Sequence, residues 1–100
     1  MNFDANAFTG FDWDEGNLSK IPAKHPVSNT EAEQMFANIP LLVTDDAGHS
    51  QNERRFRALG QTNEGRILHV SFTLRGDKVR IISARPANRK ERNTYENLNA

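Results

Sequence analysis

Residues 74–95 read LRGDKVRIISARPANRKERNTY, and this stretch decides the fold that we expect. It predicts a strand end, a tight turn at Gly76-Asp77, a returning strand over Lys78 to Arg85 and then a helix. Asn88 and Glu91 have capping-box spacing, so Asn88 should cap that helix. The cations of such a strand–helix unit can hold phosphate by charge and by forked hydrogen bonds. They are Arg75, Lys78, Arg80, Arg85, Arg89, Lys90 and Arg92.

Alternating apolar and polar residues extend the predicted sheet upstream. The clearest strand is Arg66 to Arg75, in which the even-numbered positions from 68 to 74 are all apolar. Weaker patterns predict further strands over Arg54 to Thr62, Leu41 to Thr44 and Phe11 to Trp13. We therefore expect a central antiparallel sheet of three or four strands.

Strict alternation over Lys78 to Arg85 would put its two internal arginines on different faces. Val79, Ile81, Ser83 and Arg85 would share one face, and Arg80, Ile82 and Ala84 the other. Arg80 and Arg85 would then not share a site unless a β-bulge lay between them.

Two helices are predicted before the sheet. The first should span Glu15 to Lys24, with Asp14 as its cap. Pro22 removes a backbone donor, so we expect either a kink there or a shorter helix. The second should span about Asn29 to Asn38 and follows the capping box Ser28–Glu31. Its inward stripe is Ala32, Met35, Phe36 and Ile39.

These elements fit one α+β domain over residues 1–100, with a loose start over residues 1–10. The two N-terminal helices should pack on one face of the sheet, and the C-terminal helix follows it. The chain has no cysteine, so neither a disulfide nor a thiolate metal site is expected. It also lacks an apolar run of ~20 residues and a signal-peptide core, and we expect a cytoplasmic protein without membrane contact.

Zero net charge conceals two oppositely charged halves. Residues 1–53 contain nine acidic and two basic residues, whereas residues 54–100 contain eleven basic and four acidic residues. The basic half could meet nucleic acid or an acidic protein. Alternatively, the two halves could neutralise each other within the fold.

Several motifs then follow one another over residues 11–95. They are Phe11-Asp12-Trp13-Asp14, Lys24-His25-x-Val27-Ser28 with Glu31-Ala32, His49-Ser50, Arg55-Phe56 with Gly60, Gly65-Arg66, and Arg80-Ile81-Ile82-Ser83-Ala84-Arg85-x-Ala87-x-Arg89-x-Glu91-Arg92 with Tyr95. In this order they resemble the BrnT family, the ribonuclease half of type II toxin–antitoxin systems. The Ile-Ser-Ala-Arg strand with its Arg-x-Glu-Arg helix is the most specific part. The chain departs from the family at two prolines. Pro22 lies inside the first predicted helix, and Pro26 stands where the family commonly has glycine after the Lys-His pair.

The resemblance implies a RelE-like fold and a metal-independent endoribonuclease that inhibits translation. It also implies an antitoxin of the BrnA type, a DNA-binding ribbon-helix-helix protein. We expect a complex of two toxins with two antitoxins, in which only the antitoxin contacts DNA. Neither a cofactor nor a metal ion is expected.

Metal-free RNA cleavage needs proton transfer from the 2′-hydroxyl and stabilisation of charge on the phosphorane. Arginine suits the second task, and we expect Arg85 and Arg55 at the scissile phosphate. The expected base is His25 or Glu53, and Tyr95 is expected to hold the substrate. Further RNA contacts are expected from Lys24, Arg80, Arg89 and Arg92.

Structural roles compete with each of these assignments. Arg85 could pair with an acidic residue, Tyr95 could pack on the sheet, and His69 on the less apolar face of its strand could be a structural residue. His49 is placed in a loop. The histidines lack metal-ligand spacing. The alternative function is a non-catalytic binding module, whose basic strand–helix surface engages an acidic protein or nucleic acid.

Overall fold

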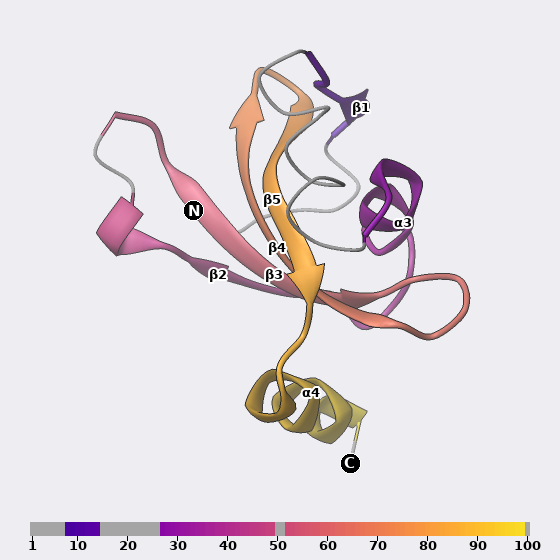
Figure 1. The fold of residues 1–100 in the computed structure, drawn as a ribbon. Coiled ribbons are helices and arrows are strands. Elements are labelled where there is room, and N and C mark those ends of the chain that lie inside the picture. Colours follow the sequence, from indigo (N-terminus) through magenta and orange to yellow (C-terminus); the bar gives the residue numbers. More distant parts are fainter. Residues whose placement is uncertain (1–7, 15–26, 50–51, 100) are drawn as a thin grey trace.

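One mixed sheet organises the protein. The computed structural model describes residues 8–14, 27–49 and 52–99, and its strands lie in the order β1-β5-β4-β3-β2 (Figure 1). They are β1 Gly10–Phe11, β2 Leu42–Asp45, β3 Arg55–Gln61, β4 Ile67–Arg75 and β5 Lys78–Pro86. Strands β2 to β5 are antiparallel neighbours, and β1 pairs parallel to β5. The α+β class is confirmed, but the expected antiparallel sheet of three or four strands is corrected to a five-stranded mixed sheet.

The fifth strand comes from the N-terminal segment. Gly10 pairs with Lys78, and the backbone N–H of Asp12 donates to the carbonyl of Val79 at 2.8 Å. The predicted strand over Phe11 to Trp13 therefore begins one residue earlier and is shorter. Alternation could not show this pairing, because a two-residue strand has no measurable period.

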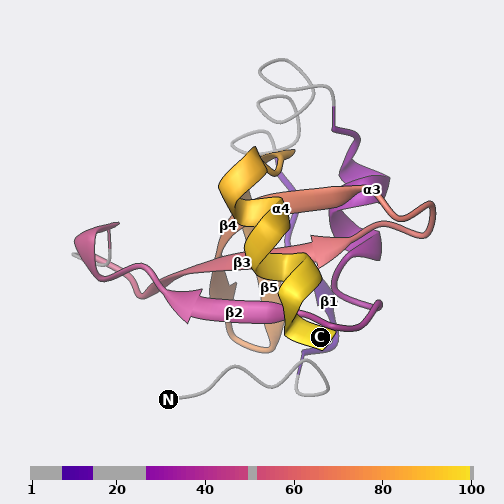
Figure 2. The ribbon, with the colours of Figure 1, turned by 90° about the horizontal axis from the view of Figure 1, so that it is seen from below.

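The hydrophobic core lies on one face of the sheet. Helix α3 (Asn29–Gln34) covers this face, opposite α4 (Figures 1 and 2). Just beyond α3, Met35 and Phe36 are buried, and the ring of Phe36 meets that of Phe72 edge-on at 5.1 Å. The other buried strand residues of this cluster are Phe56, Ala58, Leu68, Val70, Val79, Ile81 and Ala84.

Helix α3 ends earlier than its apolar stripe predicts. It was expected to reach Asn38, but the α-helix ends at Gln34, with Met35 as its C-cap. Ile39 therefore does not point inward as expected and is 85% exposed. The other predicted N-terminal helix, Glu15 to Lys24, lies outside the described residues.

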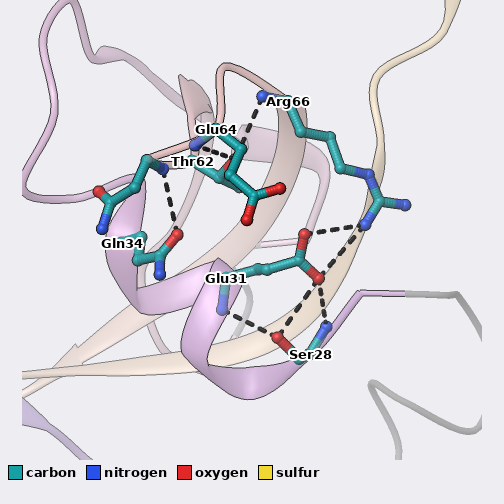
Figure 3. Close-up of polar contacts among 7 residues, drawn as sticks. Ser28, Glu31, Gln34, Thr62, Glu64 and Arg66 are labelled. Atoms are coloured by element: carbon teal, nitrogen blue, oxygen red, sulfur yellow. Dashed lines mark hydrogen bonds and ion pairs between the residues drawn. The ribbon is translucent and has the colours of Figure 1, made fainter.

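A capping box anchors α3 to the β3–β4 hairpin (Figure 3). The side chain of Ser28 accepts from the N–H of Glu31, and the Glu31 carboxylate accepts from the N–H of Ser28. Arg66, from the hairpin, donates to both Glu31 oxygens at 3.0 and 3.3 Å. Sequence analysis predicted the cap, and the arginine ties it to the sheet.

A β-bulge changes the face on which β5 presents its arginines. Ser71 pairs with Ser83 but the next residue, Phe72, pairs with Ile81, so Ile82 has no partner in the ladder. The extra residue restores the same face for positions 80 and 85. The expected separation of Arg80 and Arg85 onto opposite faces is therefore corrected.

The C-terminal helix, α4 (Arg89–Glu96), lies across the other face of the sheet (Figure 2). It packs on β3 and β4. Tyr95 is buried, and its hydroxyl donates to the carbonyl of Pro40 at 2.6 Å. A short 3₁₀ turn, Asn97–Asn99, follows. Within the described ranges, no helix has the length and apolarity needed to cross a membrane.

Candidate active site

The sheet face opposite α3, here called the open face, carries three rows of neighbouring side chains. Cross-strand partners share a face and lie about 5 Å apart. The rows across β3, β4 and β5 are Arg55–Thr73–Arg80, Arg57–Ser71–Ser83 and Leu59–His69–Arg85. Apart from Leu59, these side chains carry a cation, an imidazole or a hydroxyl group, whereas those of the core face are apolar.

Arg85 and Glu91 form a forked ion pair on the open face. Both terminal guanidinium nitrogens of Arg85, Nη1 and Nη2, donate to the Glu91 carboxylate, at 2.7 and 2.9 Å. Glu91 is also the third residue of the α4 capping box, in which it accepts from the N–H of Asn88 at 2.9 Å. Hydrogen bonds from Arg85 hold the pKa of Glu91 at about 2, against a usual 4.5. The carboxylate is therefore ionised at every physiological pH.

His69 lies beside this pair. It is the cross-strand neighbour of Arg85, and its Nε2 is 3.8 Å from Glu91 Oε2. Burial lowers the pKa of His69 below 6.5, and the positive charge of Arg85 lowers it further. The imidazole is therefore mainly neutral at pH 7 and can accept a proton.

Arg85 keeps donors for a ligand despite its ion pair. Its Nη1 also donates to the Pro86 carbonyl at 3.3 Å. An arginine has five N–H groups, and these bonds use three of them. No described residue accepts from the remaining two, so a phosphate oxygen could take them.

A hollow of ≈ 240 Å³ lies between α4 and the sheet, next to His69. Its other lining residues are Leu42, Thr44, Arg57, Ala58, Leu59 and Glu91. Arg57 is exposed and, among the described residues, its side chain has neither a hydrogen bond nor an ion pair. The hollow therefore places a free cation, a neutral imidazole and an apolar wall in one concave site.

The other end of the open face is occupied by ion pairs between the acidic and basic halves of the chain. Arg80 forms a fork with Asp14, both bonds being 2.9 Å, and Glu53 pairs with Arg75 at 3.3 Å. Elsewhere in the fold, Asp45 pairs with Arg54 and Glu31 pairs with Arg66, so an acidic residue of the first half again meets an arginine of the second half. The alternative that the halves neutralise each other is thus confirmed for these four arginines.

The expected phosphate ligands Arg85 and Arg55 are not brought together. They lie two rows apart, which corresponds to roughly 13 Å along the strands. Glu53 lies beside Arg55 in the chain and lines another hollow with it and His49, of ≈ 360 Å³. Arg55 could therefore meet a different phosphate of the same strand, but not the one beside His69.

The remaining predicted residues differ in their surroundings. Lys24 and His25 lie outside the described residues. Tyr95 is only 5% exposed, which favours packing on the sheet over stacking on a base. Arg89 is exposed at the start of α4, and Arg92 donates to the carbonyl of Ala87 at 2.8 Å.

The sequence did not single out Arg57 or Glu91 as candidate site residues, and it left His69 undecided between a functional and a structural residue. Their convergence depends on strand register and on the bulge, which set the cross-strand neighbours. One signal was present, since Arg57, His69 and Ser71 all occupy the alternate positions opposite the apolar core residues. Among the described residues, no group of three or more potential metal ligands is found.

Comparison with known families gives one match. A family model described as "Ribonuclease toxin, BrnT, of type II toxin-antitoxin system" matches residues 13–91. That range contains the whole open face, including Glu91 on α4. No curated protein sequence matches the chain.

Proposed function

Because the chain belongs to the BrnT family of type II toxin–antitoxin ribonuclease toxins, we propose that His69, Arg85 and Glu91 form its active site. The reaction is metal-independent cleavage of RNA. The observation that carries the proposal is a neutral histidine directly beside an arginine with two free donors, on an open sheet face. Neither residue type would be needed there for packing.

In this mechanism, His69 takes the proton of the 2′-hydroxyl as general base. The 2′-oxygen attacks the adjacent phosphorus, and the bond to the 5′-oxygen breaks. Arg85 donates to the phosphate oxygens, on which negative charge accumulates. The leaving 5′-oxygen takes a proton from solvent, and the imidazolium of His69 returns its proton to solvent.

Glu91 is a positioning residue in this scheme. Its carboxylate holds the guanidinium of Arg85 and stands near His69, where it stabilises the imidazolium that forms. Its pKa of about 2 supports this role, because it stays negative throughout the reaction.

The other expected site residues keep secondary roles in the proposal. Arg55 and Arg89 contact neighbouring phosphates, Arg92 adds charge beside them, and Lys24 stays a proposed RNA contact. Arg80 contributes charge while paired with Asp14. Tyr95 positions α4 through Pro40. His25 and Glu53 remain candidates for the proton-transfer group, and they are tested against His69.

Product analysis tests the chemistry. Purified protein is incubated with RNA in excess EDTA, and the new 3′ ends are identified. Cleavage by the 2′-hydroxyl predicts a 2′,3′-cyclic phosphate and no cutting at a nucleotide that carries a 2′-deoxy sugar. Cutting that EDTA abolishes, or that continues at the 2′-deoxy position, contradicts the mechanism.

The antitoxin belongs to the same proposal. A BrnA-like ribbon-helix-helix partner would cover the open face and α4 in a 2:2 complex and would supply all DNA contacts. Light scattering on the co-purified pair measures the stoichiometry, and a gel shift with and without antitoxin locates the DNA contacts. A 1:1 complex, or DNA binding by the toxin alone, contradicts these parts.

The alternative of a non-catalytic binding module also has an observation in its favour. Glu91 already engages the fork of Arg85, and four other arginines are paired within the fold. A folded protein that binds its partner tightly and leaves RNA intact would support this alternative.

A further inference from the structure

The hollow beside His69 has the shape and chemistry of a nucleobase site. Leu42 and Leu59 are cross-strand neighbours of β2 and β3, and both line it, so they offer an apolar surface to a flat ring. Polar groups surround this surface: the hydroxyl of Thr44, the guanidinium of Arg57 and the carboxylate of Glu91. An apolar wall with a few polar groups of fixed identity is typical of sites for small aromatic ligands.

The polar groups select one base. Arg57 has its whole fork of N–H donors available, and such a fork matches the O6 and N7 acceptors of guanine. The Glu91 carboxylate supplies the opposite polarity. Its Oε1 already accepts from Arg85 and from Asn88, but its Oε2 accepts only one bond from a described residue, which leaves one lone pair for the N1 hydrogen of guanine. Adenine, cytosine and uracil do not present this combination of acceptors and donors.

We propose that the hollow binds one unpaired guanine base of single-stranded RNA. The inference rests on the proposed function, because it names the substrate of the same site. A base paired in a duplex is held in the stack and could not enter a space between α4 and the sheet. His69 borders both the hollow and Arg85, so a guanine in the hollow brings its own ribose and 3′-phosphate to His69. Cleavage is therefore expected on the 3′ side of guanosine.

A binding measurement with RNA that cannot be cleaved tests base selection separately from cleavage. The probes are four fluorescent 2′-O-methyl oligoribonucleotides, identical except for one central G, A, C or U, which lack the nucleophile. Anisotropy at fixed salt should show the G probe binding at least about fivefold tighter than the others, the effect of one forked arginine–guanine contact. Arg57→Lys keeps the charge but loses the fork, so it should remove this preference. Arg54→Lys, at an exposed arginine that pairs with Asp45 outside the hollow, is the matched control and should keep it.

Equal binding of the four probes overturns the guanine site, and so does a G preference that survives Arg57→Lys in a variant with unchanged melting temperature. Cleavage of ordinary RNA, mapped in parallel, distinguishes this failure from failure of the proposed function. Cutting without base preference would overturn the guanine site and keep the ribonuclease. Selective binding of the G probe without any cutting would support the guanine site and count against the chemistry at His69.

Discussion

The two described α-helices begin with the same device but in different surroundings. In both, the third helical residue is a glutamate that completes a capping box and binds an arginine of the sheet: Glu31 with Arg66, and Glu91 with Arg85. The first pair lies at the hairpin, with both side chains about a third exposed. The second lies over the open face, where the carboxylate is 20% exposed and faces His69.

The difference shows how a structural motif becomes part of a site. Both glutamates have a lowered pKa, but only that of Glu91 is reduced to about 2, because Arg85 donates two short hydrogen bonds to a less exposed carboxylate. The α4 pair also has His69 beside it, with His69 Nε2 3.8 Å from Glu91 Oε2. The α3 pair therefore serves as an internal control for the α4 pair.

The largest effect is expected for His69→Gln. Glutamine keeps a polar side chain of similar size but cannot act as a base at neutral pH, so kcat/KM for RNA should fall about 10²- to 10⁴-fold. His49→Gln is the matched control, because His49 is exposed in a 3₁₀ turn and pairs with Asp46. If the two variants retain the same activity, the base lies elsewhere, and Glu53 and His25 become the next residues to test.

The next largest effect is expected on stability, where Glu91→Gln should lose more than Glu31→Gln. Glu91→Gln keeps a capping side chain but removes the charge that Arg85 binds, so the free energy of unfolding should fall by about 2 kcal/mol at pH 7. Glu31→Gln should cost less than about 1 kcal/mol, since its pair is more exposed. Urea unfolding measures both. Equal losses would mean that the two capping boxes do not differ energetically.

The same contrast has a pH dependence. A carboxylate with a lowered folded pKa stabilises the fold above its unfolded pKa, here 4.5, and loses this contribution as the pH falls toward about 2. The wild type should therefore lose more stability over this window than Glu91→Gln. Parallel curves for the two proteins would rule out a large shift at Glu91.

Activity should depend on pH through His69. The lowered pKa keeps the imidazole neutral, so kcat/KM should be level near pH 7 and fall toward tenfold per unit at acidic pH. The midpoint should lie below 6.5. A pH–rate profile measures this limb, and Glu53→Gln should preserve it. A midpoint above 6.5 would contradict a buried neutral histidine beside Arg85.

The smallest effect is expected for Tyr95→Phe. Loss of the hydroxyl leaves the Pro40 carbonyl without its bond and should cost about 1 kcal/mol of stability. Activity should change less than threefold, since the ring rather than the hydroxyl holds α4. Thermal unfolding and RNA cleavage measure the two effects. A loss of activity that exceeds the loss of folded protein would instead support the expected contact of Tyr95 with substrate.

Local signals predicted most of the fold. Alternation and turn residues located β2 to β5 within one or two residues, and capping boxes located the starts of α3 and α4. Three features depended on long-range geometry: the pairing of Gly10 with Lys78, the early end of α3, and the bulge at Ile82. None of them leaves a period or a turn signal in the sequence.

The candidate site was less predictable for the same reason. Arg85 was recognised from its position between a strand and a basic helix. Its partners required the register of β4 against β5, which brings His69 next to it, and the docking of α4, which brings Glu91. A capping box in the sequence shows where a helix starts, but not which strand its glutamate will meet.

The two arginine–glutamate pairs provide the most direct test. RNA cleavage in excess EDTA should be measured for the wild type, Arg85→Ala and Arg66→Ala, with the folded fraction of each determined in parallel. The account predicts that Arg85→Ala loses at least about 100-fold in rate, equivalent to about 2.7 kcal/mol of barrier, while Arg66→Ala keeps the rate of the wild type per folded molecule. Equal cutting by the wild type and Arg85→Ala would contradict an active site at the His69–Arg85–Glu91 cluster.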